Sequence, residues 1–106
     1  MKELLKTVKN AVNEEYLRAA EKHGATHNSR HESYSVILEE FEESKDEIVK
    51  LDRALSLFWE TTKRNSYKGT ALAALAEMEK NAIEAAAELV QVAAMCRKAQ
   101  FTERKI

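Results

Sequence analysis

Residues 29–64 read SRHESYSVILEEFEESKDEIVKLDRALSLFWETTKR and contain neither proline nor glycine. Proline and glycine are the residues that most disfavour a helix interior, so nothing in this stretch interrupts a helix. Its larger apolar residues recur mainly at intervals of three or four, the spacing of one helix face. They include Tyr34, Ile37, Leu38, Phe41, Ile48, Leu51, Leu55, Phe58 and Trp59. The stretch therefore predicts one long helix over residues 30–64.

The start of this helix is marked by the sequence Ser-Arg-His-Glu at residues 29–32. It fits the capping box S-x-x-E, in which serine and glutamate side chains satisfy free backbone N–H groups reciprocally. Upstream, Gly24 stands where a helix C-terminal cap belongs. Apolar residues spaced by three and four precede it, which predicts a first helix over residues 2–23.

A second turn signal lies between Asn65 and Gly69, and Thr70 is the expected N-cap of a third helix. We expect this alanine-rich helix over residues 71–100 and a frayed tail over residues 102–106. Two long helices with a short link predict an antiparallel helical hairpin, with the first helix packed on it.

The composition supports an all-α, single-domain chain over residues 1–106, since it has no proline and only 2 glycines. A net charge of −1 does not favour a nucleic acid polymer as partner. No run of 18 apolar residues or signal-peptide core is present, so we expect a cytoplasmic protein without a membrane partner. Cys96 is alone, which excludes an intrachain disulfide and a cysteine zinc site.

An acidic stripe marks the long second helix. Glu40, Glu43 and Glu47 are spaced by three and four and therefore share one face. The apolar residues on the adjoining faces are expected to be buried, so the stripe borders the core. These apolar residues are Leu38, Phe41 and Ile48.

The third helix carries a polar stripe among its alanines and leucines, formed by Asn81, Glu84, Glu88 and Gln91. A hairpin centred near residues 65–66 makes the two stripes face each other, whereas a centre nearer Tyr67 shifts the pairing by about one helical turn. Facing carboxylates repel unless a cation or protons intervene, and an all-oxygen cluster suits Mg²⁺ or Mn²⁺. The expected pairs are Glu43 with Glu88, Glu47 with Glu84, and Glu40 with Gln91.

These residues resemble a known family. Glu39-Glu40-x-x-Glu43 followed by Glu88-x-x-Gln91 is similar to the EExxE…ExxD pattern of the MazG-like all-α nucleoside triphosphate pyrophosphohydrolases. Residues 31–40, HESYSVILEE, look like the HEAYAVxxEE segment of a phage-associated branch. Residues 87–95, AELVQVAAM, look like its ELVQVAAM segment.

The resemblance implies Mg²⁺-dependent hydrolysis of a nucleoside or deoxynucleoside triphosphate to monophosphate and pyrophosphate, by a homodimer or homotetramer. Carried over to this sequence, Glu40, Glu43 and Glu88 are metal ligands and Glu39 is an outer-shell group. Gln91 stands at the family's fourth ligand position, an aspartate, and offers only a neutral oxygen.

The sequence departs from the family in a second respect, because the 44 residues between Glu43 and Glu88 exceed the usual spacer. Glu47 or Glu84 is a candidate to compensate for Gln91, as a ligand or as the catalytic base. Two alternatives stay open: a catalytically decayed, nucleotide-binding relative, and an unrelated helical bundle with a structural role.

Other side chains receive simpler interpretations. We expect His31 at the helix start or in the core, and His23 and His27 on the surface near a helix end. Phe58 and Trp59, near the apolar hairpin tip, are either core beneath the first helix or a contact with another subunit; we favour the contact with another subunit of a homo-oligomeric helical bundle.

Overall fold

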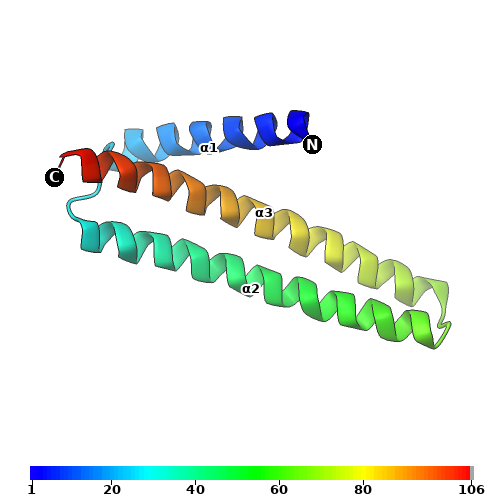
Figure 1. The fold of residues 1–106 in the computed structure, drawn as a ribbon. Coiled ribbons are helices and arrows are strands. Elements are labelled where there is room, and N and C mark those ends of the chain that lie inside the picture. The colour runs from blue at the N-terminus through cyan, green and yellow to red at the C-terminus, as the bar shows by residue number, and fades with distance from the viewer. Residues whose placement is uncertain (106) are drawn as a thin grey trace. The chain divides into compact units, whose positions relative to one another are not determined.

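The computed structural model describes residues 1–105, which form three helices and no strand (Figure 1). The helices are α1 (Lys2–His23), α2 (Arg30–Lys63) and α3 (Lys68–Lys105). This confirms the all-α prediction and the extents of the first two helices to within one residue. No helix in the described part of the chain has both the length and the apolarity needed to cross a membrane.

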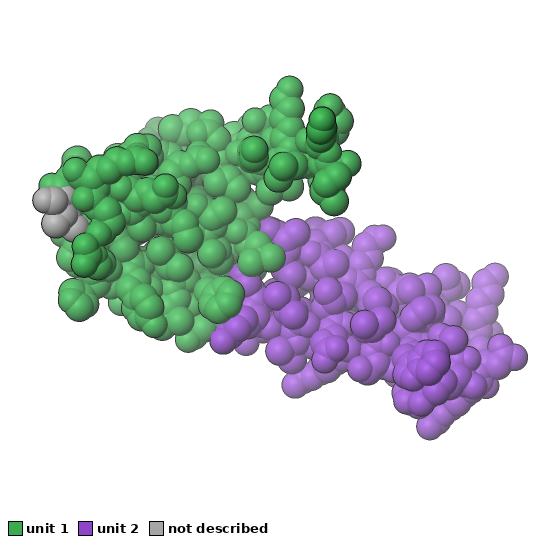
Figure 2. Space-filling model, viewed as in Figure 1, with its two compact units in different colours: residues 1–42, 88–106 green, residues 43–87 purple. Residues whose placement is uncertain are grey.

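The chain divides into two compact units (Figure 2). Unit 1 contains Met1–Glu42 together with the segment that starts at Glu88, and unit 2 is Glu43–Ala87. Segments of α2 and α3 pack against each other within each unit, and α1 belongs to unit 1. The prediction of one domain over residues 1–106 stays a prediction.

The core of unit 1 joins α1 to α3. Val12 and Tyr16 of α1 are buried against Ala94 and Met95 of α3. The small side chain of Ala94 allows α3 to approach α1 closely. The larger side chains of Tyr16 and Met95 fill the remaining space between the two helices. Partly buried residues of all three helices surround these four, namely Ala19, Ala20, Val36, Ile37 and Val90.

The connection between α1 and α2 largely follows the sequence signals. Gly24 has φ 91°, a conformation that side chains disfavour, and its N–H donates to the carbonyl of Ala20 at 2.8 Å. Ser29 Oγ accepts from the Glu32 backbone N–H at 3.1 Å, as expected. The capping box also predicts that the Glu32 carboxylate accepts from the backbone N–H of Ser29. It accepts instead from the side-chain amide of Asn28, at 3.0 Å.

The predicted start of α3 at Ala71 was wrong by three residues, since the helix begins at Lys68. The break between α2 and α3 falls earlier, at Asn65, whose φ of 51° lies in the left-handed region that asparagine tolerates. Thr70 is therefore already helical, and its N–H donates to the carbonyl of Tyr67 at 3.0 Å. Gly69 lies in the first turn, where a Cβ atom would meet the Tyr67 ring.

The predicted end of α3 at Gln100 and the frayed tail were also wrong, because the helix continues to Lys105. Thr102 is buried, and its Oγ donates to the Lys98 carbonyl and accepts from the backbone N–H of His27, each at 2.8 Å. Glu103 pairs with Arg30. Contacts with the α1–α2 connection and the start of α2 thus hold these turns; residue 106 lies outside the described residues.

The predicted burial of Leu38, Phe41 and Ile48 was wrong, since their exposed fractions are 37%, 45% and 46%. Within its unit, each side chain lies on a part of α2 that neighbouring helices do not cover. The helical periodicity identified these residues as one apolar surface but did not tell which surface the chain itself covers.

Candidate metal centre and adjoining cavity

Two of the predicted metal ligands meet in unit 1. Glu40 of α2 and Glu88 of α3 are both half-buried, and each offers a carboxylate oxygen within 4.8 Å of the other. This separation allows one cation to contact both carboxylates. Glu43 follows Glu40 by three residues, one turn along α2, and is exposed; it is the first residue of unit 2.

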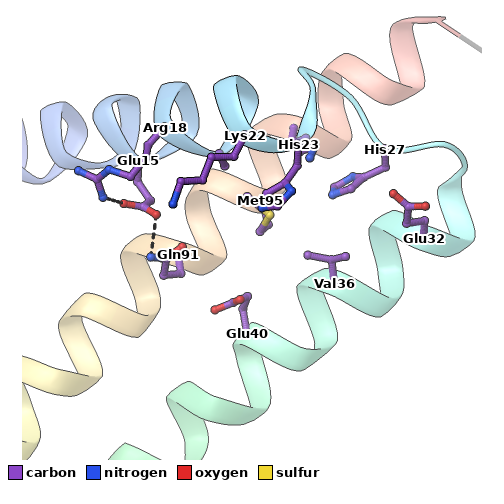
Figure 3. Close-up of a pocket in the computed structure, with 12 residues that line it drawn as sticks. Glu15, Arg18, Lys22, His23, His27, Glu32, Val36, Glu40, Gln91 and Met95 are labelled. Carbon is purple, nitrogen blue, oxygen red and sulfur yellow. Dashed lines mark hydrogen bonds and ion pairs between the residues drawn. The ribbon is translucent and has the colours of Figure 1, made fainter.

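Gln91 lies one turn after Glu88 in α3, and its amide nitrogen donates to Glu15 of α1 at 2.9 Å (Figure 3). Because a carboxylate only accepts hydrogen bonds, the amide nitrogen must face Glu15. The carbonyl oxygen of Gln91 is not used in this bond. Arg18 pairs with the other oxygen of Glu15, so α1 fixes Gln91 through an ion-paired carboxylate.

The other three predicted site residues are divided between the two units. Glu39 is exposed on α2 in unit 1, whereas Glu47 and Glu84 are half-buried in unit 2. Lys50 donates to Glu47 at 3.1 Å and holds the pKa of Glu47 below its ordinary value. Glu84 is close enough to lower the same pKa, so this predicted pair does meet. The second oxygen of Glu47 is buried without a hydrogen-bond partner among the described residues.

A cavity of about 460 Å³ opens in unit 1 and has Glu40 and Gln91 in its wall (Figure 3). This volume lies in the range of small-molecule sites. All three helices and the α1–α2 connection line it, and Val36 and Met95 give it an apolar portion. Its charged lining residues are Glu15, Glu32, Glu40, Arg18, Lys22 and Lys98.

His27 lines this cavity from the α1–α2 connection and is only 6% exposed, so its predicted surface position was wrong. Its Nδ1 lies 2.7 Å from Ser33 Oγ, and its Nε2 is buried without a hydrogen-bond partner among residues 1–105. Burial lowers the pKa of His27, the positive charge of Lys98 lowers it further, and Glu32 opposes the change. His31 is exposed at the helix start, outside the core.

Sequence reasoning missed the contribution of α1 to this site. Glu15, Arg18 and Lys22 all line the cavity. They are spaced by three and four residues, so they share a face of α1 next to the buried Tyr16. This polar stripe beside a core position was a readable signal that α1 helps to form the site.

No protein-family model, curated protein or solved structure significantly matches this chain. The resemblance to the MazG-like pyrophosphohydrolases therefore stays a prediction based on the motifs around Glu40 and Glu88.

Proposed function

We propose that this protein hydrolyses a nucleoside or deoxynucleoside triphosphate to the monophosphate and pyrophosphate, with Mg²⁺ or Mn²⁺ held by Glu40, Glu43 and Glu88. The observation that carries the proposal is the approach of the Glu40 and Glu88 carboxylates to within 4.8 Å in unit 1. Glu40 also lines a cavity of about 460 Å³, which offers room for a ligand beside this carboxylate pair.

The donor set fits a hard divalent cation. Glu40, Glu43 and Glu88 provide only carboxylate oxygens, and Mg²⁺ typically binds through one or two carboxylates together with substrate phosphates. The neutral carbonyl oxygen of Gln91 is a candidate fourth donor. When bound, such a cation would offset part of the negative charge of the triphosphate and polarise a phosphoryl oxygen.

The remaining predicted site glutamates are assigned different roles in the reaction. Glu39 is proposed as an outer-shell group, and Glu47 or Glu84 as a further ligand or as the base. The base accepts a proton from water as the water oxygen bonds to the α-phosphorus. The bond from the α-phosphorus to the bridging oxygen breaks, and pyrophosphate leaves with that oxygen.

We further propose that α2 and α3 form one antiparallel hairpin and that the chain works as a cytoplasmic homodimer or homotetramer. Many large apolar side chains are at least one-third exposed, and a second copy is a natural cover for them. In unit 2 they include Leu55 at 50% and Trp59 at 57% exposure.

Glu43→Gln and Glu88→Gln should each lower kcat/KM by about 100-fold or more, because each removes a negative charge from the metal site; a 100-fold loss corresponds to about 2.7 kcal/mol. The measurement is pyrophosphate release in a screen of common triphosphates with Mn²⁺ or Mg²⁺. Glu42→Gln is the matched control, since Glu42 is an exposed glutamate of the same helix. Full turnover in either site variant contradicts the metal assignment.

A second candidate is a nucleotide-binding protein that has lost catalysis. It is favoured by Gln91, whose neutral amide donates to Glu15 where a carboxylate ligand is expected. Calorimetric titration of Mn²⁺ with a non-hydrolysable triphosphate separates the possibilities: heat without turnover indicates the binding protein, and no heat indicates a structural role. A gain in turnover for Gln91→Asp would show that the glutamine weakens an otherwise complete site.

A further inference from the structure

The cavity of unit 1 is lined by one buried polar atom without a hydrogen-bond partner among residues 1–105 and by a lysine of low exposure. Nε2 of His27 is enclosed and accepts or donates no hydrogen bond among residues 1–105. Lys98, like His27, is only 6% exposed and lines the same cavity. Unlike Nε2 of His27, its ammonium group is not an enclosed atom, and it forms no hydrogen bond or ion pair within the described residues.

The ammonium group of a lysine that lines a cavity attracts an anionic partner. Other side chains already engage two of the three acidic residues of the cavity. Glu15 is bonded to Arg18 and Gln91, and Glu32 is bonded to Asn28. The third, Glu40, belongs to the proposed metal site. The surroundings of Lys98 therefore favour an anion supplied from outside the chain.

His27 offers a hydrogen-bond donor to the same anion. A hydroxyl group can donate to Nδ1 of an imidazole, and Ser33 Oγ lies 2.7 Å from that nitrogen. With Nδ1 accepting this bond, the ring proton lies on Nε2, and Nε2–H becomes a donor that has no acceptor in the described chain. Lys22 extends from α1 into the same space and adds a second ammonium group (Figure 3).

We propose that Lys98, Lys22 and Nε2–H of His27 form a binding site for a phosphate chain. Three donors, two of them positively charged, match the many oxygens of a di- or triphosphate better than a single carboxylate. Glu40 lies in the wall of the same cavity, so a phosphate chain bound here would share the cavity with this carboxylate. The identification of this chain as the triphosphate of a nucleotide rests on the proposed function; the phosphate site itself does not.

The test is calorimetric binding of inorganic tripolyphosphate, pyrophosphate and ATP in the presence of EDTA, which removes any dependence on metal and on catalysis. Lys98→Met should weaken tripolyphosphate binding at least tenfold, since methionine retains an apolar stem but no charge. Lys22→Met, at an exposed position, should weaken it without disturbing the fold. Lys105→Met, an exposed lysine of the same helix as Lys98, is the control.

A second readout follows the ring nitrogens of His27 by NMR. Tripolyphosphate should shift the Nε2 resonance in the native chain and in Lys105→Met, and the shift should require a higher concentration in Lys98→Met. Binding of tripolyphosphate and ATP supports a nucleotide tail as ligand, and binding of tripolyphosphate alone supports an inorganic polyphosphate site. Absence of binding, or unchanged affinity in both Lys98→Met and Lys22→Met, overturns the proposal.

The two proposals fail separately. Metal-free binding that depends on Lys98, without triphosphate hydrolysis under any metal condition, leaves the phosphate site intact and removes the enzymatic function. Hydrolysis that depends on Glu43 and Glu88 but shows the native KM in Lys98→Met and Lys22→Met supports the enzymatic function and removes the phosphate site.

Discussion

The imidazole of His27 is surrounded by groups that oppose a positive charge on it. Burial and the nearby Lys98 ammonium lower its pKa, and Glu32 compensates only in part. The unfolded chain, with a histidine pKa of about 6.5, therefore binds a proton at a pH where the folded chain does not. The contribution of His27 to the free energy of unfolding is fully present above about pH 7.5. It is lost as the pH falls through 6.5 toward the pKa of His27 in the folded chain.

We accordingly expect the free energy of unfolding to fall between pH 7.5 and pH 5.5, by no more than about 1.4 kcal/mol per pH unit for this one proton. The measurement is urea denaturation in phosphate-free buffer at fixed protein concentration. His27→Gln should flatten the dependence. His31→Gln, which changes an exposed histidine, should keep it. Equal slopes in the native chain and His27→Gln would contradict this account.

For individual residues, the sequence pointed to the acidic side chains of the candidate site but not to the residues that line the cavity beside them. The proximity of Glu40 and Glu88 was predictable, because each lies in a stripe of polar residues at helical spacing and the two stripes were expected to face each other. The burial of His27 was not, since it depends on Thr102, which is 75 residues away and bonds to the His27 backbone. No local pattern encodes such a contact.

Among the elements, α3 shows how a helix end depends on contacts distant in sequence. Its last turns contain Arg104 and Lys105, which suit a helix C-terminus, yet the sequence offers no cap that fixes the end there. Thr102 and Glu103 bond to the α1–α2 connection and to the start of α2. The existence of all three helices was predictable from the lack of proline, whereas these bonds set where α3 ends.

Thr102→Val should lower the free energy of unfolding by about 1–3 kcal/mol, because the buried N–H of His27 loses its acceptor while the side-chain volume is retained. Chemical denaturation measures this change. Thr62→Val is the control: Thr62 is exposed and its hydroxyl donates to the carbonyl of Phe58 in its own helix. We expect about 0.5 kcal/mol or less for the control, and similar losses in both variants would show that the contact to His27 adds nothing.

For the whole molecule, the exposed apolar surface is the largest feature that periodicity could not resolve. The sequence distinguishes apolar from polar faces, but it does not state whether a face is covered by the same chain or by another. Leu38, Phe41 and Ile48 illustrate the difference, since all three lie on an apolar pattern and all three are exposed.

Trp59→Glu should weaken self-association by about 30-fold or more, because it places a charge on an apolar surface that we expect a second copy to cover; aromatic residues commonly dominate such interfaces. Sedimentation equilibrium measures the molar mass and the dissociation constant. Ser66→Glu, which adds the same charge in the exposed α2–α3 turn, is the control. Unchanged association of Trp59→Glu would place the interface elsewhere.

The bonds that join His27 to Thr102 and Arg30 to Glu103 also affect the order in which the chain acquires structure during synthesis. Unit 2 is one uninterrupted segment, so its contacts form once Ala87 has left the ribosome. Unit 1 requires partners 73 and 75 residues apart and must wait for Glu103 to emerge. Until then α1 and the first turns of α2 lack their partners in α3, and the cavity of unit 1, where we propose that phosphate binds, is among the last parts of the molecule to form.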